Sequence, residues 1–143
     1  MTEGPKEPGQ DIIASEFNAR AVDGYEGCAE EYASTTGPDH LALGELVKVL
    51  TQDGHVLEIG SGPGWDADWL EARGANVRRT DAAQSFVDLQ NARGKPAERL
   101  DVLRDPLGGP YDAIVAMYVL QHVDRPALPQ VLRKVADALA VLL

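Results

Sequence analysis

The stretch His55-Val56-Leu57-Glu58-Ile59-Gly60-Ser61-Gly62-Pro63-Gly64 decides the fold of this chain. Residues 56–59 form an apolar run that is typical of a buried strand, and three glycines follow at alternate positions. An amphipathic stretch begins at Trp65. A strand, a glycine turn and a helix start together form the part of an α/β fold that contacts an adenine-containing cofactor.

The spacing of the glycines separates two kinds of nucleotide site. A dinucleotide-binding turn has the pattern Gly-x-Gly-x-x-Gly, and Trp65 stands where that pattern needs its last glycine. We expect the bulky indole to obstruct the close approach of a pyrophosphate. The chain has instead the pattern Glu58-x-Gly60-x-Gly62-x-Gly64. The alternative is an ordinary strand-to-helix turn without a ligand.

A second acidic residue follows the glycine turn at the spacing of a ribose-binding acid. Asp81 comes 21 positions after Gly60, directly behind a predicted strand at residues 76–80. In nucleotide-binding βαβ units, an acidic residue about 20 positions on binds the ribose hydroxyls, because a carboxylate accepts two hydrogen bonds side by side. Asp81 could also cap the helix predicted at residues 83–93. The two roles are compatible.

Three later segments follow in a recognisable order: Arg99–Val102, Tyr111–Met117 and Val119–Val123. With the glycine pattern, they resemble the class I S-adenosylmethionine-dependent methyltransferases over roughly residues 50–140. The last segment is similar to the small-molecule branch of that family, the type 11 or ubiquinone-biosynthesis-like methyltransferases. The resemblance implies S-adenosyl-L-methionine as the cofactor and transfer of its methyl group to an unknown small molecule.

The resemblance also implies a role for each motif. The acidic residue before the glycines would steer the methionine ammonium, and the turn would line the methionine and ribose with backbone. The acid after the second strand would hold the ribose, and the end of the third strand would hold the adenine. The implied cofactor-binding residues are Glu58, Gly60, Ser61, Gly62, Gly64, Asp81, Ala82, Asp101, Val102 and Met117.

Few other side chains are candidates for chemistry. His122 is the one histidine near the predicted mouth of the site, and it is a candidate general base or a structural histidine bonded to the loop. We favour the structural role, because methyl transfer often needs only alignment of nucleophile and methyl group. Tyr25 and Tyr32 would either cover the ligand or pack on the sheet. The three histidines and one cysteine show no metal-ligand spacing.

Composition narrows the partners and the compartment. The formal net charge of −10 argues against nucleic acid and against an anionic membrane surface. No apolar run reaches the length of a membrane span. Cys28 is the only cysteine, which excludes an internal disulfide and favours the reducing cytoplasm.

The chain is expected to form one α/β domain behind a short tail. We predict a disordered tail at residues 1–10, N-terminal helices at 11–52, and the cofactor-binding domain at 53–143. Strands are predicted near residues 55–60, 76–80, 97–102 and 112–117, with helices near 65–73, 83–93 and 126–140. Their alternation predicts a Rossmann-like open parallel sheet with helices on both faces, and the resemblance implies the strand order 3-2-1-4. Arg78 and Arg79 are unexpected in an interior strand.

The end of the chain departs from the family pattern. Val141–Leu143 is the expected stub of a fifth strand, and the further strands that the family usually has are missing from the sequence. An exposed sheet edge of this kind predicts self-association. It also leaves an alternative function, a non-catalytic cofactor-binding or interaction module. A third alternative, an NAD-type dehydrogenase, is disfavoured by Trp65 and by the lack of a catalytic Tyr/Lys or His/Asp set.

Overall fold

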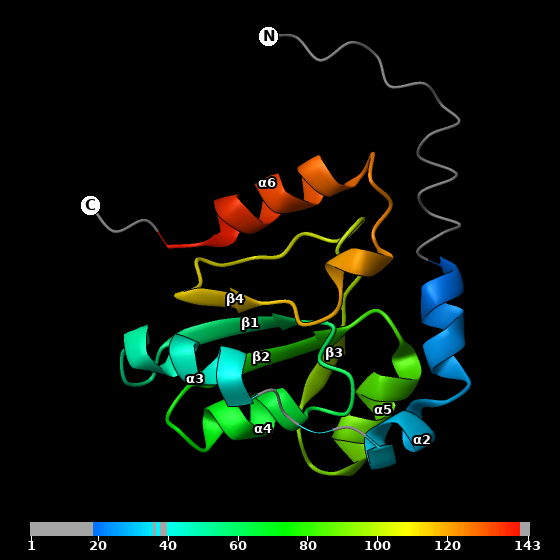
Figure 1. The fold of residues 1–143 in the computed structure, drawn as a ribbon, viewed down its shortest axis with the longest axis horizontal. Coiled ribbons are helices and arrows are strands. Elements are labelled where there is room, and N and C mark those ends of the chain that lie inside the picture. Colours follow the sequence, from blue (N-terminus) through cyan, green and yellow to red (C-terminus); the bar gives the residue numbers. More distant parts are fainter. Residues whose placement is uncertain (1–18, 36, 38–39, 141–143) are drawn as a thin grey trace, which may run out of the picture.

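The computed structural model describes residues 19–35, 37 and 40–140, which build a four-stranded parallel sheet with helices on both sides (Figure 1). The strands are β1 (His55–Ile59), β2 (Asn76–Asp81), β3 (Ala97–Arg99) and β4 (Ala113–Val115). They lie in the order β3-β2-β1-β4, and all three neighbouring pairs are parallel. The predicted Rossmann-like sheet and its strand order are therefore confirmed.

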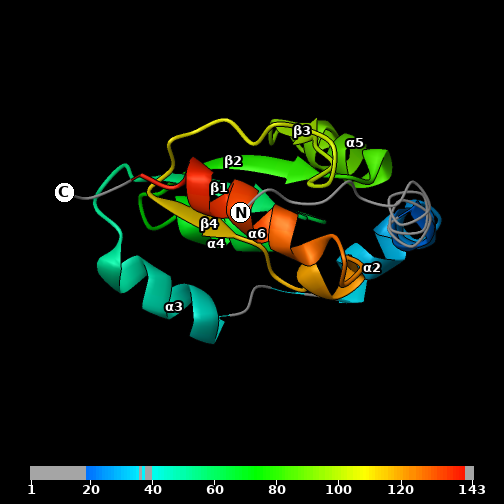
Figure 2. The same ribbon diagram turned by 90° about the horizontal axis from the view of Figure 1, so that it is seen from above.

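The helices form a layer on each face of the sheet. Figures 1 and 2 show α6 on one side, with α3, α4 and α5 on the other. Residues 19–26 are also helical and stand at the end of the sheet toward which the strands point. The remaining bounds are α2 (Ala29–Thr35), α3 (His40–Val49), α4 (Trp65–Glu71), α5 (Gln84–Ala92), the 3-10 turn η1 (Leu120–His122) and α6 (Leu128–Ala138).

Alternation along β1 builds a core on each face of the sheet. Successive side chains of a strand point to opposite faces. Leu57 and Ile59 pack in the core beneath α6, whereas Val56 packs with Leu43 of α3 and Leu70 of α4. The side chains of Val56 and Leu57 are both buried, with exposed fractions of 1% and 0%. A strand that is buried on both faces explains why residues 56–59 are almost continuously apolar.

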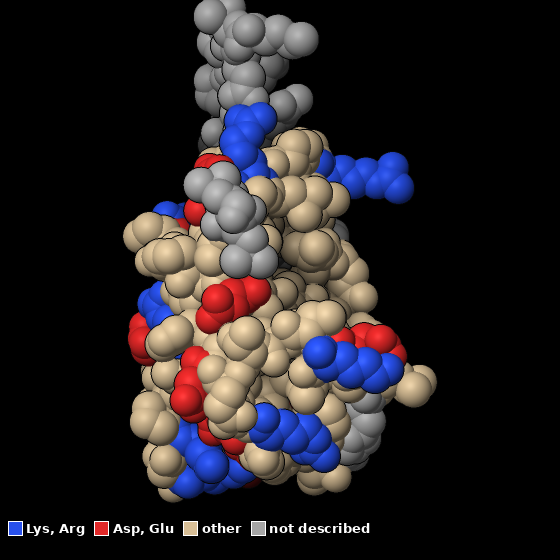
Figure 3. Space-filling view, turned by 90° about the vertical axis from the view of Figure 1, so that its left-hand side faces the viewer, with Lys and Arg blue, Asp and Glu red and all other residues tan. Residues whose placement is uncertain are grey.

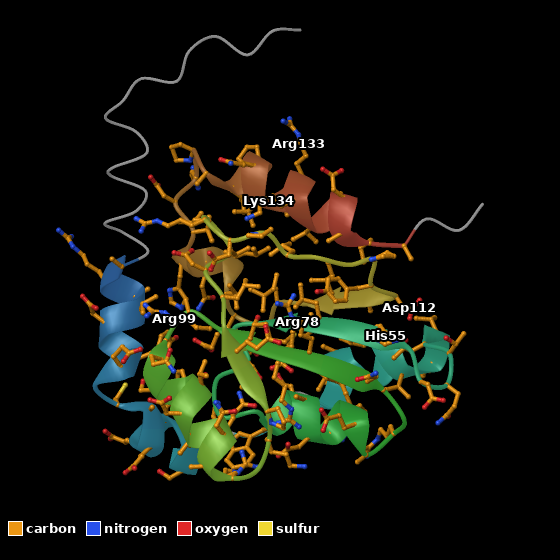
Figure 4. The ribbon with its side chains drawn as sticks, turned by 180° about the vertical axis from the view of Figure 1, so that it is seen from behind. His55, Arg78, Arg99, Asp112, Arg133 and Lys134 are labelled. Carbon is orange, nitrogen blue, oxygen red and sulfur yellow. The ribbon has the colours of Figure 1, made fainter. Side chains whose placement is uncertain are left out.

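The two arginines of β2 bond to groups on opposite faces of the sheet. Arg79 is 2% exposed, and its guanidinium pairs with Asp68 at 2.6 Å and Glu71 at 2.8 Å, both on α4. Arg78 lies on the other face (Figure 4) and donates to the Tyr111 hydroxyl at 2.7 Å, while pairing with Glu98 of β3. Each charge is matched by acceptors, which is what burial of an arginine requires.

The strands and the helices α4, α5 and α6 begin and end within two residues of the predicted ranges, except for β3, which was predicted to reach residue 102. β3 ends at Arg99, because Asp101 turns the chain by accepting a hydrogen bond from the Leu103 N–H at 2.9 Å. After α6 the chain returns to the sheet, where Leu139 pairs in parallel with Tyr111 ahead of β4. The predicted tail at residues 1–10, residues 11–18 of the predicted N-terminal helices, and the strand stub Val141–Leu143 lie outside the described residues.

Charge and hydropathy add two observations on the surface. Figure 3 views the end of the sheet where the strands begin, and there acidic and basic side chains are interspersed rather than gathered by sign. Among the residues that the structure describes, no helix combines the length and the hydropathy that a bilayer crossing requires.

Candidate functional site

A cavity of about 690 Å³, its open mouth included, lies at the carboxyl ends of the strands. This is where ligands bind in open α/β sheets. Its wall comes from the ends of β1 and β2, the segments after β3 and β4, and the N-terminal helical residues. The lining residues are Ala21, Val22, Tyr25, Tyr32, Ile59, Gly60, Gly62, Asp81, Ala82, Phe86, Leu100, Asp101, Val102, Met117, Tyr118, Val119 and His122.

The structure brings together seven of the ten predicted cofactor-binding residues, together with His122. The seven that line the cavity are Gly60, Gly62, Asp81, Ala82, Asp101, Val102 and Met117. Glu58, Ser61 and Gly64 do not line it. They lie behind the wall, on the side of the glycine turn that faces α4 and α5.

Gly60 is the residue of the turn that most needs to be glycine. Its φ of +70° is in the left-handed region, and a Cβ there would lie 2.2 Å from Cγ2 of Val119. The segment after β4 therefore packs directly on the backbone of the turn. This contact shapes the floor of the cavity and leaves no room for a side chain.

Trp65 is turned away from the cavity. It begins α4, its indole N–H donates to the Ala33 carbonyl of α2 at 3.2 Å, and the guanidinium of Arg93 covers its ring. The indole therefore does not fill the space that a pyrophosphate would need. The sequence-based steric argument against a dinucleotide is not supported by this position.

Asp81 ends β2 at the cavity wall and is tied to the backbone on both sides. Its Oδ2 accepts from the Gly62 N–H at 2.8 Å, and its Oδ1 accepts from the Ala83 N–H, at the start of α5, at 2.9 Å. Burial raises the pKa of Asp81, and these backbone hydrogen bonds oppose that rise. The Ala82 N–H also bonds this carboxylate. Two carboxylate oxygens offer about four acceptor sites, so the backbone groups do not use all of them.

Glu58 is a buried acid directly behind the turn. It is 2% exposed, and its Oε2 has no hydrogen-bond partner among the described residues. Burial raises the pKa of Glu58 to about 8, although a hydrogen bond with Ser61 acts in the opposite direction. At neutral pH the free protein therefore holds Glu58 mainly as the neutral acid.

The segment after β3 forms the far end of the cavity and is fastened to α6. Leu100, Asp101 and Val102 line the wall. Lys134 points from α6 toward this segment, whereas Arg133 points away from it (Figure 4). The Lys134 ammonium donates to the carbonyls of Val102, at 2.7 Å, and Asp105, at 2.5 Å. A cation on α6 thus stabilises the loop that carries Asp101.

Aromatic side chains close the cavity on the N-terminal side. The Tyr25 ring meets the rings of Tyr32 and Phe86 at centroid distances of 5.5 and 5.7 Å. The Tyr25 hydroxyl shares a hydrogen bond of 3.1 Å with Nε2 of His122. The helical residues 19–26 thus form a covering helix over the cavity. The His122 side chain is bonded to this covering helix rather than to its own loop, which the sequence did not predict.

Several lining residues were missed by sequence reasoning. Phe86 and Val119 lie on the wall because of how α5 and the segment after β4 pack, which no local pattern predicts. Tyr118 is 65% exposed and has a φ of +57°, a conformation that is costly for a tyrosine. Its place directly after the predicted fourth strand was the one available signal.

The charge of the cavity wall is acidic. The lining contains the carboxylates Asp81 and Asp101 and includes neither lysine nor arginine. Such a wall suits a ligand that carries positive charge. Among the described residues, no group of three or more His, Cys, Asp or Glu side chains is arranged to hold a metal ion.

Comparison with known proteins gives one family match. A family model described as a methyltransferase domain matches residues 37–142, which is well over half of the chain. No curated protein matches the chain.

Solved structures share the fold at low sequence identity. A chain described as a zinc-dependent alcohol dehydrogenase from Rhodobacter sphaeroides has a TM-score of 0.68 at 16% identity, over 80% of this chain and 48% of that one. The DhpI-SAM-HEP complex has a TM-score of 0.69 at 19% identity, over 96% and 64%. A TehB-like SAM-dependent methyltransferase from Corynebacterium glutamicum has a TM-score of 0.66 at 18% identity, over 85% and 68%. The chain thus spans about half to two thirds of the length of these proteins.

Proposed function

This chain belongs to the methyltransferase-domain family, and from that membership we propose that it binds S-adenosyl-L-methionine and transfers the methyl group to a small molecule. The observation that carries the proposal is the cavity at the carboxyl ends of the strands. There the glycine turn, Asp81 and Asp101 face one space beneath an aromatic cover. Likeness to a dehydrogenase and to methyltransferases at such low identity supports the shared fold alone.

The residues present fit this cofactor. The turn offers bare backbone at Gly62, where a Cβ would come within 3.9 Å of the Tyr32 ring that covers the space. The acidic wall suits a ligand with a sulfonium and an ammonium group. Glu58 lies behind the turn, and its Oε2 is a buried oxygen without a partner among the described residues.

Each part of the wall has a proposed task. Asp81 would accept the ribose hydroxyls with the lone pairs that its backbone bonds leave free, and Ala82 would lie beside them. Asp101 and Val102 would hold the adenine, and Met117 would contact the cofactor near β4. Glu58, from behind the turn, would act on the methionine ammonium through the loop or a water. The sulfonium, when bound, supplies the electrophilic methyl group.

The methyl acceptor would enter through the open mouth of the cavity. The protein contributes mainly alignment and exclusion of water there. His122 is a weak candidate for the base that receives a proton from an O, N or C nucleophile, because its Nε2 already bonds Tyr25. We propose a small molecule as acceptor rather than nucleic acid, since the net charge is −10 and the wall includes no basic side chain.

Calorimetry tests the cofactor assignment directly. S-adenosylhomocysteine and NAD are titrated separately into the purified chain, and we expect binding of the first and no binding of the second. Asp88→Ala, on the exposed side of α5, serves as a control that keeps the affinity. Tight NAD binding with no binding of S-adenosylhomocysteine would overturn the assignment.

A non-catalytic cofactor-binding module is the second candidate. It shares the binding site, so binding alone does not separate it from an enzyme. Radiolabelled methyl transfer to a panel of small phenols, amines and carboxylic acids, run beside the calorimetry, distinguishes the two. Turnover on any acceptor supports the enzyme, and cofactor binding without turnover across the panel supports the module.

We also propose finer assignments that the family membership leaves open: the type 11 branch, the cytoplasm as compartment, and self-association. The order of the motifs supports the branch, and Cys28, a free thiol, supports the compartment. Within the described residues β4 forms one edge of the sheet, and edge strands are templates for pairing with another chain. Sedimentation velocity tests the last point, and a monomer at all concentrations would contradict it.

A further inference from the structure

We propose that Gln90 of α5 is a positioning residue for the cofactor site: it holds the glycine turn in its ligand-ready shape from the side opposite the cavity. The inference rests on the proposed function, since it concerns the same site. Gln90 does not line the cavity and is fully buried, with an exposed fraction of 0%. A buried amide has to satisfy its donors and acceptor inside the protein, and here it does so mostly on the turn.

The amide nitrogen of Gln90 makes two contacts with the turn. It donates to the Gly62 carbonyl at 2.8 Å and to the Ser61 Oγ at 2.9 Å. Ser61 in turn shares a hydrogen bond with the buried Glu58. Gln90 is therefore connected to both Ser61 and Gly62, and through Ser61 to Glu58 of β1.

Charge on β2 decides which way the Gln90 amide faces. Arg79 donates to Gln90 Oε1 at 3.1 Å, so the oxygen is held toward the guanidinium and the two N–H groups are directed at the turn. Asp68 and Glu71 of α4 fix the guanidinium in place. A flipped amide would set its N–H groups against the positive charge of Arg79 and leave the Gly62 carbonyl without this donor.

The turn is shaped to admit Gln90. Gly64 has a φ of +89°, and a Cβ at that position would lie 2.5 Å from Gln90 Oε1 and 2.8 Å from Nη1 of Arg79. The third glycine of the motif is therefore accounted for by the approach of this pair, not by contact with the ligand. The sequence pattern Glu-x-Gly-x-Gly-x-Gly thus has glycines that face the cavity and a glycine that faces α5.

Gly62 connects Gln90 to the wall of the cavity. Its carbonyl is held by Gln90, and its N–H is held by Oδ2 of Asp81. Release of the carbonyl would free the residue to rotate and would disturb the hydrogen bond that orients the proposed ribose acceptor. Gln90 acts in this way on the ligand without touching it.

Gln90→Glu is the sharpest test, because it keeps the size and the acceptor for Arg79 but removes both N–H donors to the turn. Gln84→Leu is the matched control: it is a glutamine of the same helix, it is exposed, and its amide donates to Asp88 at 2.8 Å. The affinity for S-adenosylhomocysteine is measured by calorimetry at a temperature where each variant is folded. Hydrogen exchange of the Gly60, Ser61, Gly62 and Gly64 amides, since Pro63 has no N–H, is measured on the same samples without ligand.

We expect Gln90→Glu to weaken S-adenosylhomocysteine binding about tenfold, or about 1.4 kcal/mol, and to speed amide exchange in the turn, with Gln84→Leu unchanged in both. If the parent chain binds the compound and Gln90→Glu binds it equally well, the positioning role is overturned while the proposed function stands. If the parent chain does not bind the compound, the proposed function fails. If amide exchange in the turn is unchanged in Gln90→Glu, the positioning role of Gln90 is overturned as well. Should Gln90→Glu not fold, Gln90→Met removes the same donors and takes its place in both measurements.

Discussion

Oδ2 of Asp81 accepts a hydrogen bond of 2.8 Å from the N–H of Gly62, so the carboxylate that ends β2 is fastened to the turn that follows β1. The two residues form one wall of the cavity. Oδ1 accepts from the Ala83 N–H two positions on, which is a local turn bond ahead of α5. The helix-capping role predicted for Asp81 is not seen, since α5 has Ala83 at its N-cap and no side-chain cap.

Asp81→Ala is expected to lower S-adenosylhomocysteine affinity by about 1–3 kcal/mol, the range for a lost hydrogen bond to a charged group. It should also cost some stability, because two backbone N–H groups lose their acceptor. Asp81→Asn keeps one carbonyl acceptor and is expected to fall between the parent and Asp81→Ala. Calorimetry measures the affinities and urea unfolding the stabilities. An unchanged affinity in Asp81→Ala would restrict this residue to its structural role.

Glu58 is expected to make stability depend on pH. Its pKa is about 8 in the folded protein, against an ordinary value of 4.5. Between these pH values the folded chain keeps a proton that the unfolded chain has released, so this contribution is largest below pH 4.5 and is lost as the pH rises through 8. Glu58→Gln should therefore be more stable than the parent at pH 9 and close to it at pH 5. A stability difference that is constant with pH would contradict the burial of an ionisable acid here.

Gly60→Ala is expected to destabilise the fold by about 2–4 kcal/mol, since a left-handed φ is costly for alanine and the new methyl overlaps Val119. Gly94→Ala is the control, because Gly94 also has a positive φ but nothing lies within 4 Å of its Cβ position. We expect that variant to lose only about 1–2 kcal/mol. Adding Val119→Ala to Gly60→Ala should restore part of the loss. Urea unfolding measures all four proteins, and equal losses for the two glycines would show that the overlap is relieved cheaply.

The bond between Tyr25 and His122 is expected to hold the covering helix in place. Tyr25→Phe keeps the ring contacts with Tyr32 and Phe86 but removes the hydroxyl, which should ease opening of residues 19–26 by about 0.5–1.5 kcal/mol. Amide hydrogen exchange of those residues measures the change. Tyr118→Phe alters an exposed ring elsewhere on the cavity and should leave the exchange as it is. Equal exchange in the parent and Tyr25→Phe would mean that ring packing alone holds the cover.

Local sequence patterns were sufficient for the sheet and for the part of the site that lies on strand ends. An apolar run, a glycine turn and an acid 21 positions later locate β1, β2 and the residues behind them without knowledge of packing. Because parallel strands end at the same edge of a sheet, residues such as Gly60, Asp81 and Asp101 had to meet there once the strand order was known. The order itself came from the resemblance to a family.

The sequence by itself determined which elements form, and which of their ends face the cavity, because strand and turn signals are short-range. Only the tertiary structure decided what stands behind that wall. The unexplained Arg79 is buried because α4 supplies Asp68 and Glu71 from the opposing layer. Gln90 meets Gly62, and Tyr25 meets His122, across 28 and 97 positions of sequence. Contacts of this kind depend on how helices pack on the sheet, and no periodicity within a segment contains that information.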